Sequence, residues 1–91
     1  MQEVLSKPED TSKPLREQVF FVLHLVDFHE SWEPRFVVEE SRMAWREIDG
    51  QFIGEGTGTD ALPTLEGART RYEARRLALV NRGFVLSDMD F

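Results

Sequence analysis

The stretch QVFFVLHLVDF (residues 18–28) decides the fold class, because it is the most apolar run of the chain. It is rich in Val and Phe, and β-branched and aromatic side chains fit the pleated surface of a sheet. Apolar residues fall on both alternating faces, with Phe21 and Leu23 on one face and Phe20 and Val22 on the other. The pattern therefore predicts a strand that is central in a sheet or covered on both sides.

A helix that begins near Leu15 is the alternative interpretation, because apolar residues also recur at helical spacing. These residues are Leu15, Val19, Val22 and Val26. We favour the strand. Before it, residues 1–14 are polar, contain two prolines and show no periodicity. This composition predicts a flexible N-terminal arm over residues 1–14 and a single α+β domain over residues 15–91.

Two further strands are predicted downstream. Residues 35–40 alternate weakly between apolar and polar side chains, and residues 43–48 form the next strand. The two strands are either separate or continuous through a bend at Ser41. A loop over residues 29–34 separates them from the first strand, and Pro34 ends that loop.

Asp49-Gly50 is the strongest local signal in the chain, because both central positions of a type I′ hairpin turn need a positive φ. A two-residue turn here sets a register that pairs Trp45 with Gly54, so that a large ring covers a strand glycine. One face of the hairpin then carries Met43, Trp45 and Phe52.

Residues 54–60 (GEGTGTD) are glycine-rich and predict a connection between the hairpin and a helix. Glycine-rich loops before helices can cradle phosphate with backbone N–H groups. The candidate residues here are Gly54, Gly56, Gly58 and Thr59. No Gly-Lys-Ser/Thr ending follows, so the segment fits neither a Walker A motif nor a dinucleotide fingerprint. We favour a flexible turn with a bulge.

A long helix is predicted after Pro63. Thr64 fits an N-cap, Glu66 suits the positive helix end, and Gly83 suits the position just after the helix. The buried stripe at helical spacing consists of Leu65, Ala68, Tyr72, Leu79 and, on its edge, Val80. Residues 84–86 add a short final strand. The predicted fold class is α+β, with an antiparallel sheet of three to four strands packed against one long C-terminal α-helix.

Composition narrows the function. The chain has 91 residues, which allows one domain, and its seven Phe, two Trp and one Tyr are a large aromatic load for a small interior. We therefore expect a homo-oligomer, most simply a two-fold dimer. The net charge of −6 disfavours nucleic acid and anionic membrane, and no cysteine is present. No apolar run reaches the length of a membrane span, and we expect a cytoplasmic location.

The predicted helix is basic within an acidic chain. Residues 65–82 carry five Arg and two Glu, a net charge of +3, so the remainder carries −9. The arginines lie on two flanks of the apolar stripe, with Arg71, Arg75 and Arg82 on one flank and Arg69 and Arg76 on the other. Arg binds carboxylate and phosphate through paired hydrogen bonds, so one hypothesis is a surface for an anion or an acidic partner. A solvated helix face with local ion pairs is the alternative that we favour.

Arg76 lies near the centre of the apolar stripe. Its guanidinium must therefore reach the surface along its own stem or find a buried carboxylate. The candidate partners are Asp27, Glu39, Glu40 and Glu47.

Other candidate chemistry is sparse. Residues with metal-ligating side chains gather at His24, Asp27, His29, Glu30 and Glu33. Their spacing matches no standard site, and in a strand His24 and Asp27 point to opposite faces, so no metal or other cofactor is predicted. With two His, no Cys and no paired-carboxylate motif, no catalytic residue is predicted. Trp32, in a loop, is the side chain most expected to contact a partner.

Residues 35–80 resemble the latter part of a double-stranded RNA-binding domain. The resemblance rests on the strands, the Asp49-Gly50 turn, the phrase Phe52-Ile53-Gly54-Glu55-Gly56 and the following helix with its alanines. It implies a phosphate-binding lysine cluster at the start of the helix, where this chain has Thr64, Leu65, Glu66 and Gly67. The order of three strands and a helix is also similar to the DNA-reading arms of phage-type integrases and to WGR domains. We assign no family.

The leading hypothesis is a small cytosolic, non-catalytic interaction module. We expect it to be homodimeric and to bind a protein or a small ligand through an aromatic surface. The candidate binding residues are Trp32, Arg71, Arg75, Arg76 and Arg82. One alternative is a nucleic-acid-binding module that uses the arginine face of the helix, and a second is a small enzyme with an active site at a subunit interface.

Overall fold

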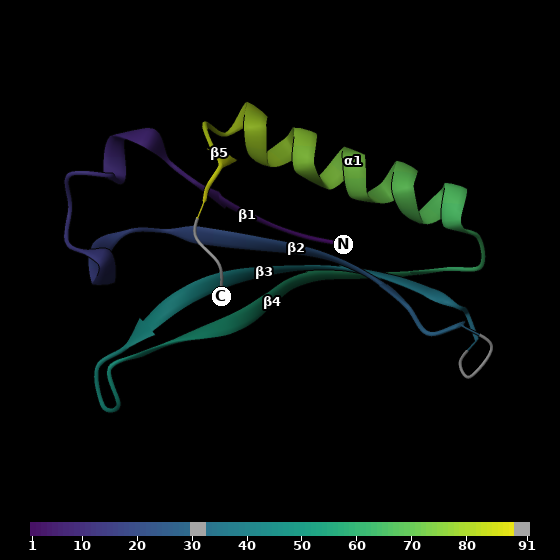
Figure 1. The fold of residues 1–91 in the computed structure, drawn as a ribbon, viewed down its shortest axis with the longest axis horizontal. Coiled ribbons are helices and arrows are strands. Elements are labelled where there is room, and N and C mark those ends of the chain that lie inside the picture. Colours follow the sequence, from purple (N-terminus) through teal and green to yellow (C-terminus); the bar gives the residue numbers. More distant parts are fainter. Residues whose placement is uncertain (30–32, 89–91) are drawn as a thin grey trace.

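The computed structural model describes residues 1–29 and 33–88, and in this part of the chain five strands form one antiparallel sheet covered on one face by a helix (Figure 1). The strand order is β4-β3-β2-β1-β5. The elements are β1 (Gln2–Ser6), the 3-10 turns η1 (Pro8–Asp10) and η2 (Leu15–Glu17), β2 (Phe20–Asp27), β3 (Phe36–Arg46), β4 (Gln51–Leu62), α1 (Leu65–Asn81) and β5 (Val85–Leu86). The predicted α+β class with its long C-terminal helix is confirmed, and the sheet has five strands where three to four were expected.

Strand β1 lies inside the segment that the sequence predicts to be a flexible arm, and for residues 2–6 that prediction is wrong. β1 pairs with β2 on one side and with β5 on the other. Val4 is 5% exposed and Leu5 is fully buried. Two adjacent apolar residues are too few to show a period in the sequence. The edge of β2 supplies the backbone partners that make them a strand.

Residues 7–19 also have defined structure. The carboxylate of Asp10 is almost fully buried and accepts a 2.9 Å hydrogen bond from Lys13 Nζ. That hydrogen bond is the main cause that lowers the pKa of Asp10 below its usual value. At Leu15 the chain makes only a 3-10 turn, and β2 begins at Phe20. The strand prediction is confirmed, and β2 is central, between β1 and β3.

Strand β3 is continuous from Phe36 to Arg46, as one of the two predicted alternatives requires. The hairpin register differs from the prediction by two residues, because the loop between β3 and β4 has four residues, 47–50. Trp45 therefore pairs with Phe52, and Met43 pairs with Gly54. A two-residue slip keeps every side chain on its face of the sheet. The Trp45 and Phe52 rings accordingly contact each other edge to face, with centroids 5.1 Å apart.

The glycine-rich segment 54–60 is part of β4, so the prediction of a flexible connection is wrong. Its partner, β3, is long enough to pair with it through Leu62. The predicted bulge is present, because the register shifts between Glu40 and Ser41 and leaves Thr57 as the extra residue of β4. The hydroxyl of Thr57 donates a 2.7 Å hydrogen bond to the carboxylate of Glu40.

Helix α1 begins and ends where its sequence signals predict. The Thr64 hydroxyl accepts a 3.1 Å hydrogen bond from the Gly67 N–H, which satisfies one of the free donors of the first turn. At the other end Gly83 has a φ of +95°. Its N–H donates to the carbonyl of Val80, and the Phe84 N–H donates to the carbonyl of Leu79. This is the Schellman arrangement, and it brings Phe84 back into the core.

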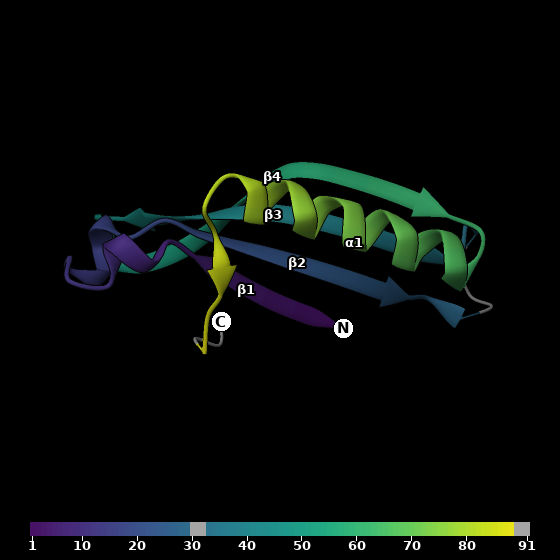
Figure 2. The same ribbon diagram turned by 90° about the horizontal axis from the view of Figure 1, so that it is seen from above.

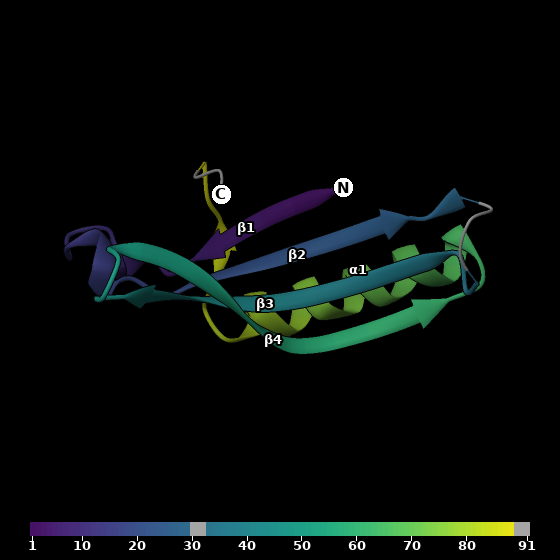
Figure 3. The ribbon, with the colours of Figure 1, turned by 90° about the horizontal axis from the view of Figure 1, so that it is seen from below.

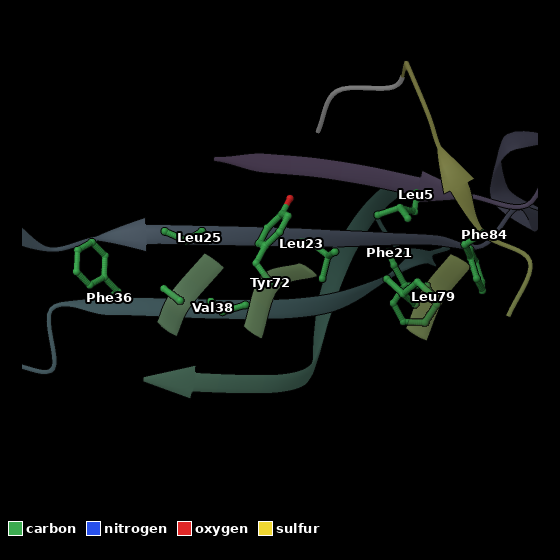
Figure 4. Close-up of a cluster of buried hydrophobic side chains, with 10 residues drawn as sticks. Leu5, Phe21, Leu23, Leu25, Phe36, Val38, Tyr72, Leu79 and Phe84 are labelled. Atoms are coloured by element: carbon green, nitrogen blue, oxygen red, sulfur yellow. The ribbon is translucent and has the colours of Figure 1, made fainter. Parts of the chain in front are cut away.

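The core lies between α1 and the strands β2 and β3, along which the helix runs (Figure 2). Figure 4 shows Tyr72 and Leu79 pointing from α1 toward the sheet. The core cluster consists of Leu5, Phe21, Leu23, Leu25, Phe36, Val38, Ala68, Tyr72, Leu79 and Phe84. Leu65 and Val80, which the predicted stripe includes, are exposed instead. Leu65 belongs to the first helical turn, and Val80 faces the flank of the helix toward β5.

The opposite face of the sheet carries no α-helix within residues 1–29 and 33–88, as the view from below shows (Figure 3). We call its middle part the open face. Successive side chains of a strand point to opposite faces of a sheet. The open face is therefore formed by the residues that are next in sequence to the core residues. They are Gln2 and Val4 of β1, Val22, His24 and Val26 of β2, Val37, Glu39 and Ser41 of β3, and Gly56, Thr59 and Ala61 of β4. Among the described residues, no helix has the length and hydropathy to span a bilayer.

Candidate functional site

Arg75 points from α1 onto the glycine-rich part of β4. Its Nη2 lies 2.8 Å from Asp60 and its Nη1 lies 3.7 Å from Glu40, and Asp60 also lies 3.8 Å from Arg71. Arg71 is exposed, whereas the side chains of Arg75, Asp60 and Glu40 are partly buried at the edge of the sheet. Two arginines and two carboxylates therefore form a network with no surplus charge.

Gly58 makes room for Arg75. A Cβ built on Gly58 would lie 2.7 Å from Cζ of Arg75, closer than van der Waals contact allows. The glycine that weakens β4 as a strand is thus the reason that the guanidinium can lie flat against the sheet.

We predict that the effect of Gly58→Ala changes sign with the residue at position 75. In the wild-type chain the added methyl group displaces the guanidinium and destabilises the domain by about 1 kcal/mol, because the ion pairs are lost. In an Arg75→Leu chain the same change stabilises by roughly 0.5 kcal/mol, because alanine restricts the unfolded chain more than glycine does. Urea unfolding of the four chains measures this coupling. Equal effects of Gly58→Ala in both backgrounds would contradict the packing described.

Arg76 finds a partly buried carboxylate, but its partner is none of the four that the sequence suggests. Its Nη1 lies 3.3 Å from Glu3 of β1, and its Nη2 lies 2.8 Å from Glu73. The Tyr72 hydroxyl also donates a 2.7 Å hydrogen bond to Glu3. The charge of Glu3, and then that of Glu73, raises the pKa of Arg76 above its usual value. Glu3 was missed because its segment was interpreted as an arm.

Arg82 lies over two aromatic rings at the end of the helix. Its Cζ is 5.2 Å from the centroid of Phe21 and 5.6 Å from that of Phe84. The arginines of the predicted surface thus take part in two carboxylate networks, and Arg82 makes two cation–π contacts. Because Arg71, Arg75 and Arg76 are neutralised by carboxylates, they supply no excess positive charge for an anionic ligand.

Among the remaining sequence candidates, the structure brings His29 close to Asp27, with its Nδ1 3.5 Å from the carboxylate, but the described residues form no larger cluster. Trp32 and Glu30 lie outside the described residues. Asp27 accepts two hydrogen bonds from Arg35, which are the main reason that its pKa is lowered to about 2. His24 lies on the other face of β2, as predicted. Within the described part of the chain, no three His, Cys, Asp or Glu residues are close enough together to hold a metal ion.

A groove between α1 and β5 is the feature that sequence reasoning missed. It has a volume of about 570 Å³ and runs from Leu5 to the ion pair of Arg76 and Glu73. Its walls are aliphatic and well exposed, formed by Leu77 (59% exposed), Val80 (47%), Val85 (45%) and Leu86 (57%). The available signal was a second row of apolar residues three apart on the helix, Ala74, Leu77 and Val80.

The aromatic rings, by contrast, are mostly interior. Phe20, Phe21, Phe36, Tyr72 and Phe84 are buried, and Trp45 and Phe52 are half-buried against one another. The most exposed large apolar side chains near one another are therefore aliphatic.

No protein-family model matches the chain, and neither a curated protein nor a solved structure shows a significant similarity to it.

Proposed function

We propose that this domain is a non-catalytic binding module that receives an apolar segment of a partner protein in the groove between α1 and β5. The observation that carries the proposal is the gathering of Leu77, Val80, Val85 and Leu86, each roughly half exposed, around one groove. Contiguous exposed apolar surface is uncommon on a protein with 31% charged residues, and such patches mark interaction sites.

The chemistry of the groove favours aliphatic side chains. Its polar end is the pair of Arg76 and Glu73, which already satisfy each other at 2.8 Å. Few polar groups are thus left to orient a polar small molecule, whereas burying a leucine-sized side chain contributes about 1.5–3 kcal/mol. A partner segment with large aliphatic residues is the best fit.

The two alternative functions have less support. Nucleic-acid binding needs unpaired cations, and Arg71, Arg75 and Arg76 are engaged with carboxylates. An enzyme with a histidine in a cleft is not favoured either, because neither His24 nor His29 lines the α1–β5 groove.

Leu77→Glu is expected to weaken peptide binding without unfolding the domain. The probe is a set of peptides selected from a displayed random library on the wild-type chain. We expect the selected peptides to carry large aliphatic residues and to lose affinity about tenfold or more on Leu77→Glu, since a charge would face the apolar walls. Isothermal titration calorimetry measures the affinities, and circular dichroism checks the fold.

Leu65→Glu is the matched control, because Leu65 is also an exposed leucine of α1 but lies outside the groove. The Leu65→Glu variant should bind the selected peptides as tightly as the wild-type chain does. The proposal fails if both variants bind equally well, or if no selected peptide distinguishes the wild-type chain from Leu77→Glu.

A further inference from the structure

We propose that the open face of the sheet is the interface of a homodimer, in which a two-fold axis parallel to β2 and β3 places His24 of each copy opposite Glu39 of the other. This inference does not rest on the proposed function, because the groove between α1 and β5 lies beside the helix and stays free in such a dimer.

The composition of the open face argues that it is covered. A sheet face in contact with water normally alternates toward polar and charged residues. Here the residues paired across the strands form three rows. The two outer rows are Val4–Val22–Ser41–Gly56 and Val26–Val37–Ala61. Neither contains a charge, and the open face has no Lys or Arg.

The middle row carries the only charged side chain of the open face, and it determines the partner. Its order is Gln2–His24–Glu39–Thr59 across the four strands. His24 is half-buried and Glu39 is exposed. They are neighbours on the two central strands, so an imidazole that can donate a hydrogen bond stands beside a carboxylate that can accept one.

A two-fold axis between β2 and β3 and parallel to them makes this row self-complementary. Rotation about this axis reverses the strand order of the second copy, so β3 of that copy lies opposite β2 of the first. Each row of residues stays opposite the same row. His24 then faces Glu39 of the second copy, twice in the dimer. The same operation sets the half-buried Val22 against Ser41, so a large side chain meets a small one, as the packing of two aligned sheets requires. Val4 contributes little to this contact, because it is already buried within its own chain.

The other two-fold axis of the same row, perpendicular to the strands, is disfavoured. It would place Glu39 against Glu39 and His24 against His24, and it would press the Ser41 hydroxyl onto Val37. Like charges facing each other at the centre of an interface are strongly unfavourable. The charge pattern thus selects one arrangement of a second copy.

Sedimentation equilibrium of the full chain and of its charge variants tests the arrangement. We expect the wild-type chain to dimerise with increasing concentration. His24→Glu should weaken the dimer about tenfold or more, because it places two carboxylates across the interface from each other. Glu39→Lys should also weaken it, because it leaves a lysine at the interface with no opposite charge. The double variant His24→Glu/Glu39→Lys should restore the dimer, since the exchanged charges again face each other.

The double variant distinguishes the two axes, because with the perpendicular axis each introduced charge would face the same charge in the other copy. Glu66→Lys makes the same charge change on α1 and should leave the dimer intact. Leu77→Glu should also leave it intact, so failure of the groove and failure of the dimer are distinguishable. A monomer at every concentration, single variants with wild-type dimerisation, or a double variant that stays monomeric would each overturn the proposal.

Discussion

Deleting residues 1–6 is expected to abolish the cooperative unfolding of the domain. The deletion removes β1, exposes the edge of β2 and leaves β5 without its partner strand. It also removes Val4 and Leu5, which are buried, and burial of an aliphatic side chain contributes about 1.5–3 kcal/mol. A domain has about 5–15 kcal/mol of stability in total, so losing both residues and the strand leaves little.

Thermal unfolding followed by circular dichroism measures this effect. A matched pair of leucines in the full chain provides the control. Leu5→Ala should destabilise by about 2–5 kcal/mol because Leu5 is fully buried, whereas Leu15→Ala should cost much less because Leu15 is 45% exposed. A deleted chain that still melts cooperatively near the wild-type temperature would show that β1 does not belong to the sheet.

Tyr72→Ala is expected to destabilise the domain by about 3–5 kcal/mol, as for other large aromatic residues cut back to alanine in a core. Tyr72 is fully buried at the centre of the cluster (Figure 4), and its hydroxyl donates a hydrogen bond to Glu3. Tyr72→Phe keeps the ring and removes only the hydrogen bond, so it should cost about 1 kcal/mol. Urea unfolding of the two variants separates packing from hydrogen bonding, and equal losses would contradict this division.

The pH dependence of stability reports on the same residue. Burial, and then the hydrogen bond to the Glu3 carboxylate, raises the pKa of Tyr72 above its usual value of 10. The unfolded chain therefore releases the phenolic proton at a lower pH than the folded chain does. The contribution of Tyr72 is fully present below about pH 10 and is lost as the pH rises further.

We expect the wild-type chain to lose stability above pH 10 more steeply than Tyr72→Phe. Tyr72 is the only tyrosine, so near-ultraviolet tyrosinate absorbance reports on it alone. The absorbance should appear only as the domain unfolds, and a tyrosine that ionises near pH 10 in the folded chain would contradict its burial.

The sequence by itself determined the elements whose signals are local. Thr64 and Gly83 mark the two ends of α1 through hydrogen bonds within a few residues of themselves. The Val- and Phe-rich run over residues 18–28 has a strong preference for a sheet wherever it lies in the chain. The shared face of Trp45 and Phe52 was also predictable, because a register slip of two residues does not change it.

Only the tertiary structure decided the rest, because those features depend on partners that are distant in sequence. Glu3 and Arg76 are 73 residues apart, and no local pattern joins them. The glycines of β4 have little strand preference, and β3 and Arg75 give that segment its conformation. The groove likewise exists because the Schellman turn at Gly83 returns β5 to the edge of β1, beside the second apolar row of α1. Local preference thus sets α1 and β2, whereas long-range pairing adds β1 and the glycine-rich part of β4 and decides which surfaces stay exposed.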